Sequence, residues 1–127
     1  MTSDEGILDV LIVEDVAADA ELALETLRRE GLVCRHRRVE TEAAMRRALR
    51  EQLPDFILSD FRLPAFNGAQ ALDVAVELCP DVPFLFVSGA IGEETAIELL
   101  KRGATDYVLK DNLARLVPSV RRALGEA

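Results

Sequence analysis

The chain has 127 residues, of which 50% are hydrophobic and 30% charged, a balance typical of one compact globular domain. Its net charge of −8 argues against nucleic-acid binding, because contacts to the phosphate backbone need a concentrated positive surface. No apolar run approaches the ~18 residues of a membrane span, and the N-terminus lacks the basic start and apolar core of a signal peptide, so we expect a soluble, cytoplasmic protein with no membrane partner.

Short apolar segments alternate with segments of helical period along the whole chain. The apolar segments predict β-strands at residues 8–13, 33–38, 55–59, 83–87 and 105–109. Helices are predicted at residues 17–30, 41–52, 67–79, 93–102 and 118–125. This alternation predicts a parallel sheet with helices on both faces. We therefore expect residues 1–127 to form a single domain. The last predicted helix ends almost at the last residue, so the alternative that this domain was excised from a longer multidomain protein stays open.

Local signals indicate several helix ends. Thr41 is expected to cap the helix that follows it, and Gly31 and Gly103 are expected to end the helices that precede them. Pro118 has no amide hydrogen, so it is predicted at the first position of the last helix, after a loose turn. Cys34 and Cys79 lack metal-type spacing and are expected to be buried, reduced thiols.

Polar groups follow the ends of four predicted strands. They are Glu14 and Asp15 after the first strand, Asp60 after the third, Ser88 after the fourth and Lys110 after the fifth. Because the carboxyl ends of parallel strands meet in one crevice, we expect these groups to converge. Three carboxylates held close together repel one another, and either a raised pKa or a bound hard cation such as Mg²⁺ relieves this repulsion.

These groups suit phosphoryl transfer. An aspartate can act as a nucleophile and become an aspartyl phosphate. Lys110 can contact a phosphoryl oxygen, the Ser88 hydroxyl can donate to another, and the small residues at 89–90 leave the approach to Asp60 open. Taken singly, Asp15 could instead cap the next helix, the serine could be a turn residue and the lysine could be solvated. Their occurrence together at four strand ends favours the phosphoryl-transfer interpretation.

Four segments carry a resemblance to a known family: VEDVAAD (13–19), LSDFRLPAFNG (58–68), FVSGA (86–90) and GATDYVLK (103–110). Together they resemble the receiver domain of response regulators in two-component signalling, over nearly the whole chain. The resemblance implies an α/β, flavodoxin-like, doubly wound parallel sheet of five strands in the order 2-1-3-4-5, with five helices on two faces. It also implies a phosphoacceptor domain that assists its own phosphorylation and dephosphorylation, and not an enzyme.

The resemblance further implies roles for individual residues. Asp60 would accept a phosphoryl group from a histidine kinase or a histidine phosphotransfer protein, and Lys110 would contact that group. Ser88 and Tyr107 would form the switch pair. A downstream output domain or a homodimer would pass the signal on. The implied cofactor is Mg²⁺, with the ligands Glu14, Asp15, Asp60 and the backbone carbonyl of Arg62.

The chain departs from the family pattern at two positions. Asp111 follows Lys110 where the family usually has proline, so the peptide bond between them is predicted to be trans, because a cis bond costs a non-proline residue about 2.5–4 kcal/mol. Arg62 occupies a position whose side chain overhangs the phosphorylation site in this family. The two departures bear on the dephosphorylation rate and the last loop, while every group that phosphorylation requires is present.

Three other functions are compatible with parts of this pattern. A flavin-binding electron carrier shares the fold, but the negative loop EDVAAD would repel the flavin phosphate. A dehalogenase-type phosphatase needs a second acid two residues after its nucleophile, where this chain has Arg62. A degenerate receiver that acts only as a protein-docking module would normally lack one of the five groups, and it stays as the alternative.

Overall fold

The computed structural model describes residues 6–89 and 91–125. The expectations about the N-terminal segment 1–5 and about Ala90 beside Ser88 fall outside these residues. Five parallel strands form one sheet, and they are β1 (Ile7–Val13), β2 (Val33–Val39), β3 (Phe56–Ser59), β4 (Phe84–Ser88) and β5 (Asp106–Leu109). Their order is β2-β1-β3-β4-β5, which confirms the predicted topology.

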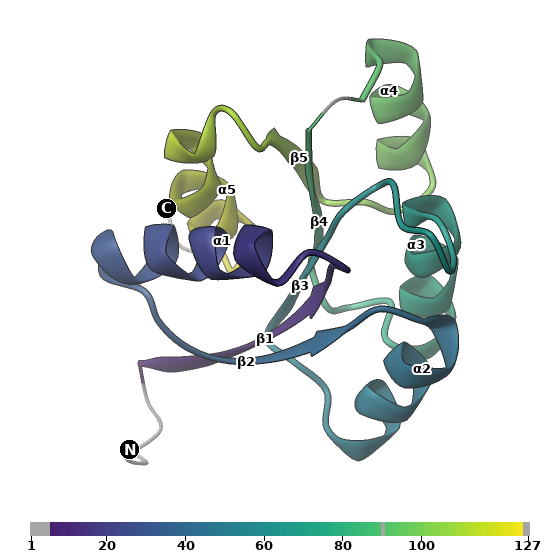
Figure 1. The fold of residues 1–127 in the computed structure, drawn as a ribbon, viewed down its shortest axis with the longest axis horizontal. Coiled ribbons are helices and arrows are strands. Elements are labelled where there is room, and N and C mark those ends of the chain that lie inside the picture. Colours follow the sequence, from purple (N-terminus) through teal and green to yellow (C-terminus); the bar gives the residue numbers. More distant parts are fainter. Residues whose placement is uncertain (1–5, 90, 126–127) are drawn as a thin grey trace.

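Five α-helices connect or follow the strands. They are α1 (Ala17–Arg29), α2 (Glu42–Glu51), α3 (Gly68–Leu78), α4 (Glu93–Lys101) and α5 (Leu116–Ala123), the last preceded by a 3₁₀ turn, η1 (Leu113–Arg115). Helices α1 and α5 lie on one face of the sheet, and α2, α3 and α4 lie on the other (Figure 1). The predicted doubly wound arrangement is therefore confirmed.

Strand β1 shows why the sheet is covered on both faces. Its side chains alternate in direction: Val10 and Ile12 pack into the core under α1 and α5, whereas Leu11 and Val13 pack into the core under α2, α3 and α4. All four side chains are buried. A strand buried on both faces reads as a continuous apolar run, which is the pattern from which the parallel sheet was predicted.

Several predicted helix ends are confirmed. The Thr41 hydroxyl accepts a hydrogen bond from the backbone N–H of Ala44 at 3.1 Å, so this residue caps α2. Gly31 and Gly103 end α1 and α4 with φ angles of 95° and 126°, in the left-handed region that favours glycine. Among the described residues there is no cis peptide bond, so the bond that precedes Asp111 is trans, as predicted.

One local prediction is wrong. The last helix begins at Leu116, so Pro118 is its third residue and not its first. Proline is tolerated there because the N–H groups of the first helical turn have no partner within the helix. The alternative role of Asp15, as the cap of α1, does not occur: the cap residue is Val16, and no side chain makes a capping hydrogen bond there.

Cys34 and Cys79 are buried free thiols, as predicted. Burial raises the pKa of the Cys34 thiol to about 11.

Within the part of the chain that the structure describes, every helix is too short or too polar to cross a membrane.

Candidate functional site

Backbone hydrogen bonds fix the strand ends relative to one another. The N–H of Glu14 donates to Val39 O at 3.0 Å, which holds the residue after β1 against β2. The N–H of Asp60 donates to Val13 O at 2.9 Å, so the residue after β3 lies beside the end of β1. The N–H of Lys110 donates to Ser88 O at 2.8 Å. The predicted polar groups therefore lie along one edge of the sheet.

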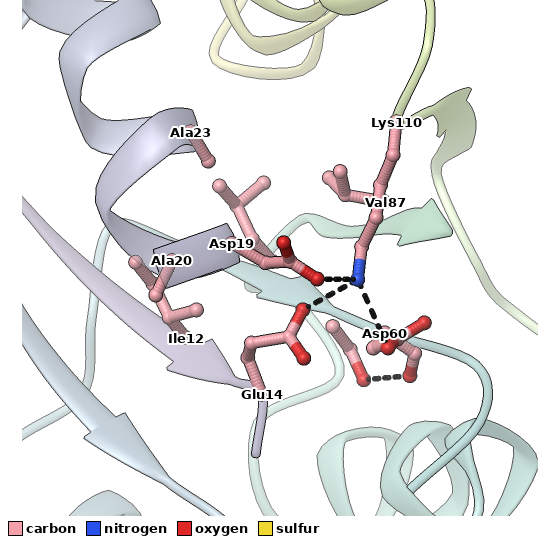
Figure 2. A pocket seen from close by; sticks show the side chains of 10 residues that line it. Ile12, Glu14, Asp19, Ala20, Ala23, Asp60, Val87 and Lys110 are labelled. Carbon is pink, nitrogen blue, oxygen red and sulfur yellow. Dashed lines mark hydrogen bonds and ion pairs between the residues drawn. The ribbon is translucent and has the colours of Figure 1, made fainter. Parts of the chain in front are cut away.

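The side chain of Lys110 reaches back over this edge to three carboxylates (Figure 2). Its Nζ lies 2.7 Å from Asp19 Oδ2, 3.0 Å from Glu14 Oε1 and 3.2 Å from Asp60 Oδ2. An ammonium group has three N–H donors, so each carboxylate can receive one. Lys110 thus joins β5 to the ends of β1 and β3 and to the first turn of α1.

Burial and charge act in opposite directions on the ionisable groups of the site. Burial lowers the pKa of Lys110, but its hydrogen bonds to Asp19, Glu14 and Asp60 outweigh that effect and raise the pKa above its usual value. Burial also raises the pKa of Glu14, and this effect exceeds the opposing hydrogen bonds from Lys110 and the Val16 amide. The lysine therefore stays charged, and a nearby cation would favour the ionised form of the buried glutamate.

One oxygen of the Asp60 carboxylate accepts backbone hydrogen bonds, and the other faces the Lys110 ammonium. Its Oδ1 accepts a hydrogen bond from the N–H of Phe61 at 2.7 Å and a longer one from the N–H of Arg62 at 3.4 Å. Its Oδ2 faces Lys110. The residue is 9% exposed. This orientation suits a group that must present one oxygen to a reactant.

Gly68, the first residue of α3, allows close packing behind this aspartate. Its N–H donates to Phe61 O at 2.8 Å. A Cβ at position 68 would lie 2.7 Å from Phe61 Cα and 2.8 Å from Asp60 O. The space behind the Asp60 backbone therefore admits only glycine.

The acidic cluster has the donor chemistry of a hard-cation site. One oxygen each from Glu14, Asp15 and Asp60 lies within 4.8 Å of the others. Carboxylate oxygens are the ligands that hard cations such as Mg²⁺ take in proteins. Glu14 is 4% exposed, and its raised pKa reports the cost of holding that charge out of water. The three predicted side chains could therefore hold a metal ion, and their oxygen donors are the kind that Mg²⁺ takes.

The other predicted site residues occupy neighbouring positions. Ser88 ends β4 and is buried. Tyr107, on the edge strand β5, pairs in register with Phe86 and packs half-buried against the core beneath α2, α3 and α4. Arg62 has an exposed side chain. The switch role of the first two and the carbonyl role of Arg62 stay predictions.

Two contributors to the site were not predicted from the sequence. Asp19 makes the shortest contact to Lys110, although it was predicted only as part of a helix. Its place in the first turn after the acidic pair was the available signal. Arg38, on the edge strand β2, donates from Nη1 to Glu14 O at 3.0 Å and so supports the acidic loop after β1.

Comparisons with known proteins point to one family. The family model of the response regulator receiver domain matches residues 10–121. The transcriptional regulatory protein ZraR of Escherichia coli is 34% identical over 120 residues, which cover 89% of this chain and 26% of that protein.

Solved structures share the fold. NtrX from Brucella abortus superposes with a TM-score of 0.81 at 27% identity, over 94% of this chain and 28% of that chain. A response regulator receiver domain protein from Clostridium thermocellum, at 18% identity, shows the fold alone, with a TM-score of 0.80 over 93% of this chain and 94% of that chain. The chain spans 16% to 27% of the length of the curated relatives it matches.

Proposed function

The chain belongs to the response regulator receiver domain family of two-component signalling, and from this premise we propose that it is a phosphorylation switch whose acceptor is Asp60. The observation that carries the proposal is the orientation of this carboxylate. One oxygen is tied to the Phe61 amide, and the other faces the Lys110 ammonium and the acidic cluster.

The proposed reaction transfers a phosphoryl group from a phosphohistidine of a histidine kinase or a phosphotransfer protein. A carboxylate oxygen of Asp60 attacks the phosphorus atom, and an O–P bond forms as the N–P bond breaks. The imidazole nitrogen keeps the electron pair of the broken bond and takes up a proton. Lys110, whose Nζ lies 3.2 Å from Asp60 Oδ2, would contact a phosphoryl oxygen.

The proposed cofactor is Mg²⁺, which the side chains of Glu14, Asp15 and Asp60 would hold. The family resemblance adds the backbone carbonyl of Arg62 as a further ligand. When bound, it would neutralise negative charge on the transferring phosphoryl group. The protein's own contribution is to hold the carboxylates together and to orient Asp60 through the Phe61 amide.

The output of the switch is also a proposal. We infer that phosphorylation draws the Ser88 hydroxyl toward the new phosphoryl group and lets Tyr107 move inward, which would reshape the surface of α4, β5 and α5. That surface would act on an output domain or on a second copy of the chain. The small share of each curated relative that this chain covers supports a receiver that works beside other domains.

The test is Mg²⁺-dependent labelling by acetyl phosphate, followed by intact-protein mass spectrometry. The wild-type protein should gain one phosphoryl group, and Asp60→Asn, which keeps the shape and removes the nucleophile, should gain none. Asp81→Asn, which changes an exposed aspartate, is the matched control and should label like the wild type. An acyl phosphate on Asp60→Asn would show that another residue is the acceptor, and an unlabelled wild type would favour the docking module.

A further inference from the structure

We propose that Asp19 competes with the incoming phosphoryl group for Lys110, so that it weakens phosphoryl binding while it strengthens binding of the divalent cation. This inference rests on the proposed function of Asp60. It makes Asp19 a positioning residue, because its carboxylate acts on the transferred group through the lysine and through its charge.

The Lys110 ammonium group already has a carboxylate partner for each of its N–H donors. Asp19 Oδ2 is the closest of the three carboxylate oxygens to Lys110 Nζ, at 2.7 Å, and the contact is a short, charge-assisted hydrogen bond. The three carboxylate oxygens match the three N–H donors of the ammonium group in number. A phosphoryl oxygen can therefore gain a donor from Lys110 only by replacing or sharing one of these contacts.

The three contacts differ in what a cation would do to them. Glu14 and Asp60 belong to the acidic cluster, so a bound cation would draw their oxygens and weaken their hold on the lysine. Asp19 is outside that cluster of Glu14, Asp15 and Asp60, so its contact would persist. In the cation-loaded protein, Asp19 is then the principal competitor for the Lys110 ammonium.

The negative charge of Asp19 acts on the cation and on the phosphoryl group in opposite directions. Asp19 Oδ2 and Asp60 Oδ2 both lie within 3.2 Å of the Lys110 nitrogen, so the Asp19 charge lies close to the acceptor and to the acidic cluster. The Arg38 guanidinium, which donates to Glu14 O, is a second positive charge near this cluster. A negative charge at residue 19 attracts a divalent cation and repels an anionic phosphoryl group. The Asp19 side chain is 37% exposed, so solvent and salt reduce both effects.

Asp19→Asn tests the inference, because the amide keeps the shape and a hydrogen-bond acceptor but removes the charge. Two affinities are measured by following backbone amide signals: that for Mg²⁺ alone, and that for beryllofluoride, an anionic mimic of the phosphoryl group, at saturating Mg²⁺. The matched control is Glu21→Gln, which removes one charge from an exposed position of the same helix. Asp19→Glu restores the charge.

We expect Asp19→Asn to bind Mg²⁺ about two- to fivefold more weakly and beryllofluoride about two- to fivefold more tightly, the range that partly exposed ion pairs contribute. Glu21→Gln should leave both affinities close to wild type, and Asp19→Glu should return both toward it. General damage to the pocket would weaken both affinities together, so the opposite signs identify competition.

Weaker beryllofluoride binding by Asp19→Asn would overturn the inference, because Asp19 would then orient Lys110 for the phosphoryl group. If the wild type binds beryllofluoride and Asp19→Asn binds both ligands with wild-type affinity, only the role of Asp19 would be overturned. Failure of the wild type to bind beryllofluoride at saturating Mg²⁺ would overturn the proposed function and this inference with it.

Discussion

Replacing Gly68 by alanine should distort the acceptor loop and destabilise the fold. A Cβ at this position would lie 2.6 Å from Phe86 Cε1, 2.7 Å from Phe61 Cα and 2.8 Å from Asp60 O. Two of these three neighbours are backbone atoms, which cannot rotate away as the end of a flexible side chain can. The added methyl group must therefore push α3 away from the segment that carries Asp60.

Overpacking of this kind costs about 1–3 kcal/mol in the free energy of unfolding. For a chain of this size, that corresponds to a melting temperature lower by about 4–12 °C. The assay is thermal and urea denaturation followed by circular dichroism. Because Asp60 O and Phe61 Cα must shift, the Phe61 amide that holds the acceptor carboxylate should move too. Mg²⁺ affinity should then fall along with stability.

Gly89→Ala is the matched control for stability, since a Cβ at that position has no atom within 4 Å among the described residues. Its free energy of unfolding should stay within about 0.5 kcal/mol of wild type. If Gly68→Ala proved as stable as Gly89→Ala, the close approach of α3 to the acceptor loop would not be a constraint, and the reasoning from Cβ distances would be wrong.

Three further predictions concern the buried thiols, an exposed position in the first turn of α1 and the switch. Burial raises the pKa of Cys34 to about 11 and that of Cys79 above its usual value, so both thiols should resist iodoacetamide in the native protein and react in denaturant; alkylation of the folded protein would contradict this. Ala18→Trp, a bulky change at an exposed position of α1, should slow transfer from the cognate phosphotransfer protein but spare acetyl phosphate labelling, and equal loss with both donors would indicate damage to the pocket. Beryllofluoride should shift the amide signals of Ser88, Tyr107 and the α4–β5–α5 surface, and shifts confined to the pocket would refute the switch.

The order of the strands and the convergence of the acidic groups could be predicted because both follow from repeating patterns. Apolar runs that alternate with helical periods lead to a parallel sheet, and a parallel sheet brings its strand ends to one edge. Glu14, Asp60 and Lys110 each follow a strand, so their approach was a matter of topology. No side-chain geometry was needed for that prediction.

The start of α5 could not be predicted in the same way. Proline is compatible with several positions in the first helical turn, since none of the N–H groups there has a partner within the helix. The choice among those positions depends on packing. Leu116 and Val117 are buried against the core beneath α1 and α5, and the helix begins early enough to include both. Burial of these two apolar side chains thus decided between alternatives that the proline alone left equal.

The contact between Asp19 and Lys110 depends on how closely α1 approaches the sheet, which no local pattern encodes. The two residues are 91 positions apart in the chain. Ala20 and Ala23 are buried on the sheet-facing side of α1 and line the same pocket (Figure 2). Side chains this small let the helix axis lie near the strands, so the short Asp19 side chain can reach an ammonium that extends from β5. The sequence shows the two alanines and the acid that precedes them, but only the packed helix shows that this acid meets the lysine.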